Sequence, residues 1–225
     1  MSGCASLSMA LLLALVGVVR AAAPIRIMAV GDSITEGHEP QFMAYRYPLA
    51  AKLAAAGYAV KFVGTKTSPS PLGPLPHEGY SGKDAEFLVE TVPAHFRDHP
   101  ADVVLLHAGH NHDAKDHPVA GIVAANEALI QAFRATNPRV TVLLAEVIPS
   151  GKLPKYSYIP ELNQALAQLA TRLSTPAQRV IIVDQVAGFN WATDTIADKV
   201  HPNALGTEKM AATWFLALRR ILPKP

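Results

Sequence analysis

Five short apolar runs that alternate with helix-like segments constrain the fold of this 225-residue chain most strongly. The runs have strand length and lie at Ile25–Val30, Tyr58–Val63, Ala101–Ala108, Arg139–Val147 and Arg179–Asp184. The segments with helical composition or periodicity lie at Tyr47–Gly57, Asp84–Asp98, Gly121–Thr136, Ile159–Leu173 and Ala204–Arg220. Apolar strands alternating with helices are typical of a parallel sheet buried on both faces. The sequence therefore predicts an α/β domain of three layers (α/β/α), with a flavodoxin-like, doubly wound sheet of five parallel strands.

Two segments depart from this regular pattern. Pro93 lies inside the helical segment Asp84–Asp98, and a proline in a helix interior predicts a kink or a break there. Gly64–Tyr80 contains four prolines and is longer than most connections between elements. We expect this segment to be a loop, and it is either a binding loop or a plain surface loop.

The N-terminal residues 1–23 differ from the rest in composition. Met9–Val19 is an apolar run of eleven residues, too short to cross a hydrocarbon core of about 30 Å, and Arg20 and three alanines follow it. This pattern predicts a signal peptide at 1–23 and a mature domain at 24–225. A buried N-terminal helix and an uncleaved anchor are the alternatives. We expect a bacterial protein that is secreted or periplasmic, without stable membrane association after cleavage.

Charge and cysteine content exclude several classes of protein. The chain has 20 Lys and Arg against 18 Asp and Glu, so its net charge of +2 gives no basic surface for nucleic acid. Its single cysteine, Cys4, lies within the predicted signal peptide and excludes a disulfide-stabilised small domain. The length allows a core large enough to stabilise the fold without a metal or disulfides.

Polar motifs follow the first and the last predicted strands. In open α/β sheets, ligands bind outside the carboxyl ends of the strands. The motif GDSITEG (31–37) comes directly after the first strand and places Ser33 at a helix N-terminus, where Ser33 is either a nucleophile or only a helix cap. The motif DKVH (198–201) follows the fifth strand. There Asp198 can orient one nitrogen of His201 while the other faces a serine, although this spacing is also common by chance.

Two possible oxyanion donors belong to the same edge of the predicted sheet. Asn111 follows the third strand, and its side-chain amide can donate to a developing negative charge. Gly82 follows the Gly64–Tyr80 segment and can offer its backbone N–H at close range. A preorganised donor of this kind is typically worth about 3 kcal/mol of transition-state stabilisation. Each motif is weak evidence alone, but all four lie at one edge of one sheet.

These four motifs, in this order, resemble the four blocks of the SGNH (GDSL) hydrolases. The resemblance implies a nucleophilic Ser33, a base His201 supported by Asp198, and an oxyanion hole formed by the Ser33 and Gly82 amides and the Asn111 side chain. It implies no cofactor. The stretches at 25–37, 45–65 and 77–82 also resemble acetyl xylan esterases of the third carbohydrate-esterase family.

The sequence departs from the family pattern in the third block. That block is usually Gly-x-Asn-Asp, but His112 occupies the position of the Asp, and Asp113 comes one residue late. Because Asn111 is retained, the oxyanion hole is still expected. How Asn111 is held in place is the question that this departure raises.

Several residues near the motifs are candidates for substrate contacts. Three of them have a structural alternative. Asp32 could instead brace the turn, Arg46 could form a surface ion pair, and Trp191 could pack beneath its loop. His110 and His112 suit substrate contact or polar packing. The candidates are Asp32, Arg46, His110, His112 and Trp191.

A metal site was considered because four histidines and Asp113 lie within the eleven residues 107–117. No recognised ligand spacing is present, so no metal is predicted. His107 lies inside an apolar strand and is expected to be a core residue. Trp214, in the last helix, is expected in the core as well.

The sequence leaves three functional classes open and predicts no oligomeric state. The first is an exported serine esterase that removes small acyl groups, chiefly acetyl, from an acylated carbohydrate such as acetylated xylan. The second is an SGNH esterase or lipase acting on a lysophospholipid or a bacterial surface glycan. The third is a non-catalytic carbohydrate-binding relative.

Overall fold

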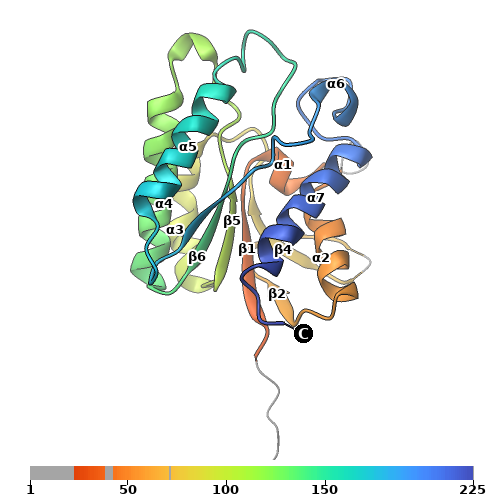
Figure 1. The fold of residues 1–225 in the computed structure, drawn as a ribbon, viewed down its shortest axis with the longest axis vertical. Helices are drawn as coiled ribbons and strands as arrows, with labels where there is room; N and C mark the ends of the chain where they lie inside the picture. The colour runs from red at the N-terminus through yellow and green to blue at the C-terminus, as the bar shows by residue number, and fades with distance from the viewer. Residues whose placement is uncertain (1–22, 39–42, 71, 225) are drawn as a thin grey trace, which may run out of the picture.

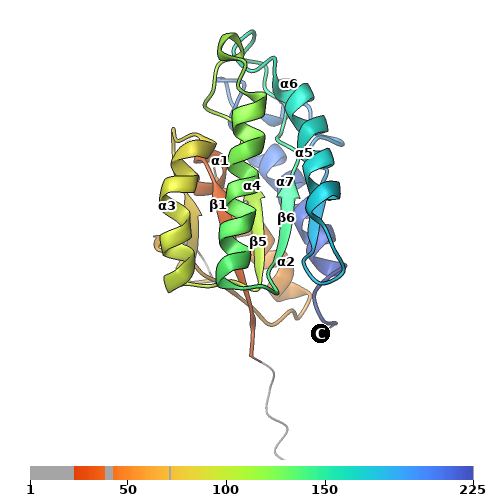
Figure 2. The same ribbon diagram turned by 90° about the vertical axis from the view of Figure 1, so that its left-hand side faces the viewer.

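A computed structural model describes residues 23–38, 43–70 and 72–224 of the chain. It forms the three predicted layers, with helices on both faces of a central sheet (Figures 1 and 2). The predicted signal peptide, except for Ala23, lies outside the described residues. Among the residues that the structure describes, no helix has the length and hydropathy needed to cross a bilayer.

The five predicted strands are confirmed, and they pair in parallel. Their spatial order is β2 (Val60–Phe62), β1 (Ile25–Gly31), β5 (Val103–His107), β6 (Thr141–Ala145) and β7 (Val180–Val183). In chain order these are strands 2-1-3-4-5, which is the flavodoxin-like, doubly wound arrangement. The first and third of these strands are therefore neighbours, and the loops after them meet.

The Gly64–Tyr80 segment is not a loop throughout, so that prediction was wrong. It contains β3 (Lys66–Ser68) and β4 (Leu75–Gly79), which pair antiparallel, and β4 also pairs in parallel with the carboxyl end of β1. The sheet therefore has seven strands rather than five. The two extra strands are short, β4 contains Pro76 and further prolines lie between the strands, so the segment lacks the alternation of apolar residues by which a strand is recognised.

The five predicted long helices are also present. Three of them, α3, α4 and α5, cover one face of the sheet, and α2 and α7 cover the other (Figure 1). The helices are α1 (Ser33–Glu36), α2 (Arg46–Ala55), α3 (Ala85–Asp98), α4 (Val119–Thr136), α5 (Ile159–Leu173), α6 (Trp191–Asp194), α7 (Ala204–Arg219) and a 3-10 turn, η1 (Ala114–Asp116).

Helix α3 continues through Pro93, so the helix does not break there. Asp84 caps its start by accepting the N–H of Phe87 at 2.9 Å. Leu88, Val92 and Phe96 are buried on one side of α3. Their burial stabilises the helix by several kcal/mol in total, which offsets the hydrogen bond that a proline removes.

The core has two parts, one on each face of the sheet. All of β5 is buried, since it lies in the middle of the sheet and is covered by helices on both sides. Trp214 of α7 is fully buried beside Tyr45, with ring centroids 5.9 Å apart, which confirms the prediction that it is a core residue. His107 is also fully buried, which confirms that it is a core histidine.

Two buried histidines are held neutral by their surroundings. His77 Nδ1 accepts the N–H of Gly79 at 3.0 Å, and burial, with the nearby positive charges of Arg46 and Lys66, lowers the pKa of His77 to about 3. His107 Nε2 accepts the N–H of Ile148 at 3.4 Å, and burial lowers the pKa of His107 to about 4. Protonating either accepting nitrogen would break its hydrogen bond.

These histidines should make the fold sensitive to mild acid. Both pKa values lie below the value of about 6.5 for an unfolded histidine. At pH values between the folded and the unfolded pKa, the unfolded chain binds more protons than the folded one, so stability falls as the pH decreases through this range. Each histidine is expected to contribute up to about 1.4 kcal/mol per pH unit. Urea unfolding between pH 7 and pH 4.5 would measure this slope.

The variants His77→Asn and His107→Gln keep an acceptor but cannot be protonated in this range, so each should flatten the slope. His99→Asn is the matched control, because His99 is exposed. An unchanged slope in both buried variants would contradict the assignment.

Candidate active site

The structure brings together the three residues of the predicted triad. Ser33 begins α1 directly after β1, and its Oγ lies 2.8 Å from Nε2 of His201, a residue 168 positions later in the chain. His201 Nδ1 lies 2.5 Å from Oδ2 of Asp198. The imidazole therefore stands between a hydroxyl and a carboxylate, which is the arrangement a general base needs to activate a serine.

The Asp198 carboxylate is well supported as an anion. Its Oδ1 accepts the backbone N–H groups of Val200 at 2.9 Å and of His201 at 3.0 Å, and Oδ2 faces the ring. Burial opposes ionisation, but these hydrogen bonds and His201 outweigh it and lower the pKa of the Asp198 carboxyl. An ionised Asp198 at this distance can fix the tautomer of His201 and stabilise an imidazolium formed during proton transfer.

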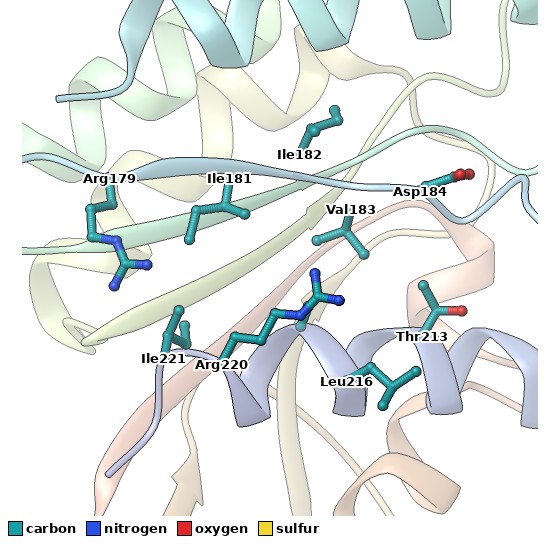
Figure 3. Close-up of a pocket in the computed structure, with 10 residues that line it drawn as sticks. Arg179, Ile181, Ile182, Val183, Asp184, Thr213, Leu216, Arg220 and Ile221 are labelled. Carbon is teal, nitrogen blue, oxygen red and sulfur yellow. The ribbon is translucent and has the colours of Figure 1, made fainter. Parts of the chain in front are cut away.

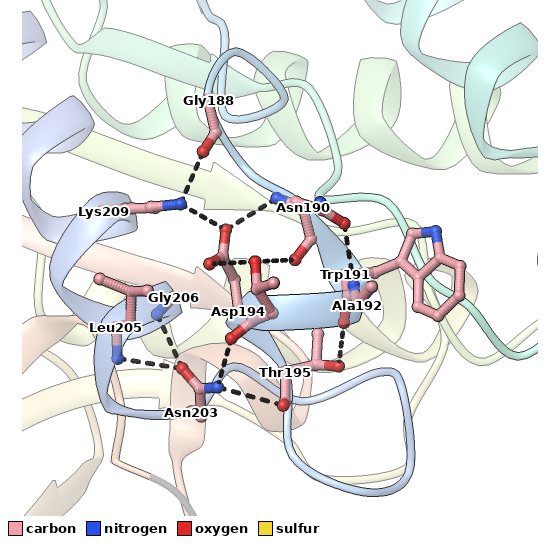
Figure 4. A network of polar contacts seen from close by, with 11 residues as sticks. Gly188, Asn190, Trp191, Ala192, Asp194, Thr195, Asn203, Leu205, Gly206 and Lys209 are labelled. Atoms are coloured by element: carbon pink, nitrogen blue, oxygen red, sulfur yellow. Dashed lines mark hydrogen bonds and ion pairs between the residues drawn. The ribbon is translucent and has the colours of Figure 1, made fainter.

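A polar network anchors the Asp198–His201 loop to α7 (Figure 4). Asn203 caps α7 through Oδ1, which accepts the N–H groups of Leu205 and Gly206. Its Nδ2 donates to the carbonyls of Thr193 at 2.8 Å and Thr195 at 3.2 Å. The segments just before and just after the loop are therefore joined through one side chain.

Asp194 anchors the same region from within the core. Its side chain is fully buried, and Oδ2 accepts the Asn190 N–H and the Lys209 ammonium, each at 2.7 Å (Figure 4). Burial opposes ionisation, but the hydrogen bonds from Asn190, Lys209 and Thr193 lower the pKa of Asp194. Neither brace was predicted from the sequence; the Pro-Asn pair ahead of the α7 segment was the available signal for the Asn203 cap.

The two predicted oxyanion donors outside the triad lie on segments that touch. Gly82 adopts the left-handed conformation (φ 73°) in the turn after β4, and Asn111 adopts it (φ 69°) after β5. Asn111 Nδ2 donates one hydrogen to the carbonyl of Lys83 at 2.8 Å. An amide NH₂ has two hydrogens, so the other can serve an oxyanion.

Glu36 ties the Gly82 turn to the nucleophile helix. Its Oε2 accepts the N–H of Ser81 at 2.6 Å, and its Oε1 pairs with the ammonium of Lys66. Burial opposes ionisation, but the bonds from Lys66 and Ser81 prevail and lower the pKa of Glu36. The sequence gives no indication of this role for Glu36, because a long-range bond from α1 to the Gly82 turn leaves no local pattern.

Asp32 and His110 are buried side by side under the site. Asp32 Oδ1 accepts the N–H of Ile34 at 2.9 Å and so caps α1, which confirms that Asp32 braces the turn. Asp32 Oδ2 lies 3.6 Å from His110 Nδ1. Asp32 is 1% exposed and His110 2%, so the structure contradicts their prediction as substrate contacts.

Arg46 is also buried rather than exposed. Its guanidinium donates to the carbonyls of Thr35 (2.6 Å), Glu36 (2.9 Å) and Leu75 (3.1 Å), and the side chain is 0% exposed. Both interpretations made from the sequence, a sugar contact and a surface ion pair, are therefore wrong. The last carbonyls of a helix need partners, and Arg46 supplies them for α1 while linking it to β4.

The remaining two candidates lie on the rim of the site. His112 is partly buried, and its Nε2 lies 2.8 Å from Oε2 of Glu86. Trp191 begins α6, is partly exposed, and packs against Gly151, with the Lys199 ammonium 5.8 Å from its ring centroid. Their contact with substrate stays a prediction.

Two groups of described residues have the composition of a metal site: Asp32 with His107 and His110, and Asp84 with Glu86 and His112. In the first group, His107 Nε2 accepts the N–H of Ile148, so the ring proton belongs on Nδ1. Ligation of an ion by His107 would therefore displace either this hydrogen bond or this proton.

Two apolar grooves lie elsewhere on the described surface. One runs between β7 and α7, with Arg179 and Asp184 toward its two ends and Leu216 on the helix side (Figure 3). The other lies between α2 and the β3–β4 hairpin and includes Met43 and Leu72. No triad residue lines either groove.

Comparisons with known proteins agree with the geometry. A family model described as the GDSL-like Lipase/Acylhydrolase family matches residues 29–209. A carbohydrate esterase family 3 structure from Talaromyces cellulolyticus is similar at 26% identity and a TM-score of 0.76, over 88% of this chain and 97% of that chain. A family 3 carbohydrate esterase of Clostridium thermocellum is similar at 28% identity and a TM-score of 0.74, over 89% and 100%.

An acetyl esterase mutant with acetate ion is similar at 25% identity and a TM-score of 0.76, over 88% of this chain and 97% of that chain. No curated protein matches the chain in sequence. These findings confirm the predicted resemblance to the SGNH (GDSL) hydrolases and to the third carbohydrate-esterase family.

Replacing Asp198 tests the triad directly. In Asp198→Asn the amide presents a donor to His201 Nδ1, which favours the wrong tautomer, so kcat for an activated ester should fall by about 10,000-fold with the fold intact. Asp184→Asn is the matched control, because Asp184 caps its own loop through the N–H groups of Val186 and Ala187 but contacts no catalytic residue. Equal activity of the two variants would contradict the role of Asp198.

Proposed function

Because the chain belongs to the GDSL-like lipase/acylhydrolase family, it is a carboxylic ester hydrolase, and we propose that it deacylates a carbohydrate. The proposed reaction removes small acyl groups, chiefly acetyl, from a polysaccharide or oligosaccharide such as acetylated xylan. The observation that carries the proposal is the contact of Ser33 Oγ with His201 Nε2 at 2.8 Å, backed by Asp198.

The reaction proceeds in two steps. His201 takes the proton of Ser33 as Oγ attacks the ester carbonyl, and the resulting oxyanion is stabilised by the Ser33 and Gly82 amides and the Asn111 side chain. His201 then returns the proton to the leaving sugar hydroxyl, which leaves an acyl-Ser33. In the second step His201 deprotonates a water molecule, which attacks the acyl group and releases the carboxylic acid and free Ser33.

Two observations support a small acyl group. The structural relatives include an acetyl esterase mutant with acetate ion. Ser33 is 8% exposed, so a small acyl group reaches its hydroxyl more easily than a bulky one.

Chain-length preference tests the acyl part of the proposal. We expect kcat/KM for 4-nitrophenyl acetate to exceed that for the octanoate ester by at least about tenfold, because each misplaced methylene costs roughly 1 kcal/mol or more. Preference for octanoate would instead support the lipase alternative. Complete inactivity on every ester would support a carbohydrate-binding relative.

The carbohydrate part requires the polymer itself. Acetate release from acetylated xylan should be rapid with the parent protein and several orders of magnitude slower with Ser33→Ala. The control is Ser174→Ala, at the end of α5 and remote from the site. Ser81→Ala is unsuitable as a control, because the Ser81 amide belongs to the Gly82 turn. Similar rates for Ser33→Ala and the parent would overturn the assignment of the nucleophile.

Export to the periplasm or medium is part of the same proposal. It rests on the apolar run Met9–Val19 and the alanines that follow. N-terminal sequencing of the protein recovered from a bacterial host would test it, with a mature start close to Pro24 as the expected result.

A further inference from the structure

Asn111 has an unusual backbone conformation for a residue expected to hold an oxyanion. Its φ of 69° lies in the left-handed region, which costs a residue other than glycine of the order of 1 kcal/mol, although asparagine tolerates it better than most. The surrounding contacts must therefore hold Asn111 in place. The residues on either side of it in the sequence, His110 and His112, make contacts that can hold it.

His110 joins the Asn111 segment to the nucleophile turn. It is 2% exposed, and its Nδ1 faces Oδ2 of Asp32 at 3.6 Å. Burial opposes ionisation of Asp32, but the electrostatic interaction with the neighbouring imidazole of His110 lowers the pKa of the Asp32 carboxyl. Asp32 immediately precedes Ser33, so this pair ties Asn111 to the residue that supplies another proposed oxyanion donor.

His112 joins the Asn111 segment to the start of α3. Its Nε2 lies 2.8 Å from Glu86 Oε2, and its Nδ1 lies 3.1 Å from the carbonyl oxygen of His110. Both ring nitrogens thus face an oxygen of another residue, and an N–H on either nitrogen has an acceptor within reach. Glu86 lies four residues after Gly82. The His112–Glu86 pair therefore connects Asn111 to the stretch of chain that carries Gly82, the third proposed oxyanion donor.

We propose that His110 and His112 are positioning residues, which hold Asn111 in the oxyanion hole by pairing with Asp32 and Glu86. This inference rests on the proposed function. Each pair links Asn111 to a segment that carries one of the other two donors, Ser33 or Gly82. The bond from Asn111 Nδ2 to the carbonyl of Lys83 completes the linkage.

The pairing also accounts for the departure from the usual third block. A carboxylate at position 112 would stand against the carboxylate of Glu86, and like charges in contact repel. His112 replaces that repulsion with a hydrogen-bond contact to Glu86. The identity of residue 112 is therefore matched to an acid on α3, a helix that is distant in the sequence.

The first experiment uses the partly exposed pair, His112 and Glu86, where a substitution leaves the core intact. Glu86→Gln and His112→Gln should each lower kcat for 4-nitrophenyl acetate by about tenfold to a hundredfold while KM stays within about a factor of two, since a misplaced oxyanion donor acts on the transition state alone. The double variant should be little worse than either single one, because both remove the same contact.

Two further variants separate positioning from general stability. Glu90→Gln is the matched control on the exposed side of α3 and should keep full activity. His112→Lys offers Glu86 a charged N–H donor and should recover part of the kcat that His112→Gln loses. Losses that appear only as a lower Tm, or additive losses in the double variant, would overturn the proposal.

The buried pair is tested with Asp32→Asn and His110→Asn. Because either could fail to fold, the rate of covalent labelling of Ser33 by an organophosphate ester is measured beside Tm, by mass spectrometry. This reaction also develops charge on an oxygen in the oxyanion hole, but it requires no carbohydrate or acyl substrate.

The labelling rate also separates failure of this inference from failure of the proposed function. A parent protein that labels but releases no acetate would refute the proposed function and leave the positioning testable. Slower labelling in Glu86→Gln and His112→Gln would then support the inference. Unchanged labelling and unchanged kcat in both variants would refute it.

Discussion

The parallel pairing of β1 with β5 is the constraint on which the site depends. It places Gly31 opposite His107 so closely that a Cβ on Gly31 would lie 2.3 Å from the His107 carbonyl oxygen and 2.4 Å from Thr35 Oγ1. Only glycine fits there. The nucleophile turn and the loop that bears Asn111 leave the sheet from these two adjacent positions, so the register of one strand pair sets the relation between them.

Around that fixed pair, the other parts of the site are attached by long-range polar contacts. Glu36 and Arg46 hold the β3–β4 hairpin and the turn that follows it against α1. Asn203 and Asp194 hold the Asp198–His201 loop against α7. Most of these side chains are buried or partly buried, and each satisfies backbone groups that would otherwise be left without partners at helix ends and turns.

The sequence was informative where local pattern and chemistry coincide. The five parallel strands follow from apolar runs, and the positions of Ser33, Asp198 and His201 follow from the strand ends they succeed. It failed where an interaction joins distant segments. The β3–β4 hairpin was not predicted because prolines interrupt the segment. The burial of Arg46 was not predicted because its charge is the same whether it is buried or exposed. Nothing next to His112 in the sequence indicates that Glu86 faces it.

The division of the proposed triad between two supports has a consequence for heat inactivation. Ser33 belongs to the β1–α1 turn, whereas Asp198 and His201 belong to a loop fastened at the start of α7. Fraying of the first turn of α7 would move the acid–base half away from the nucleophile while the central strands stay paired. Loss of activity on warming would then report a local opening, and cooling would restore it as long as the sheet had not unfolded.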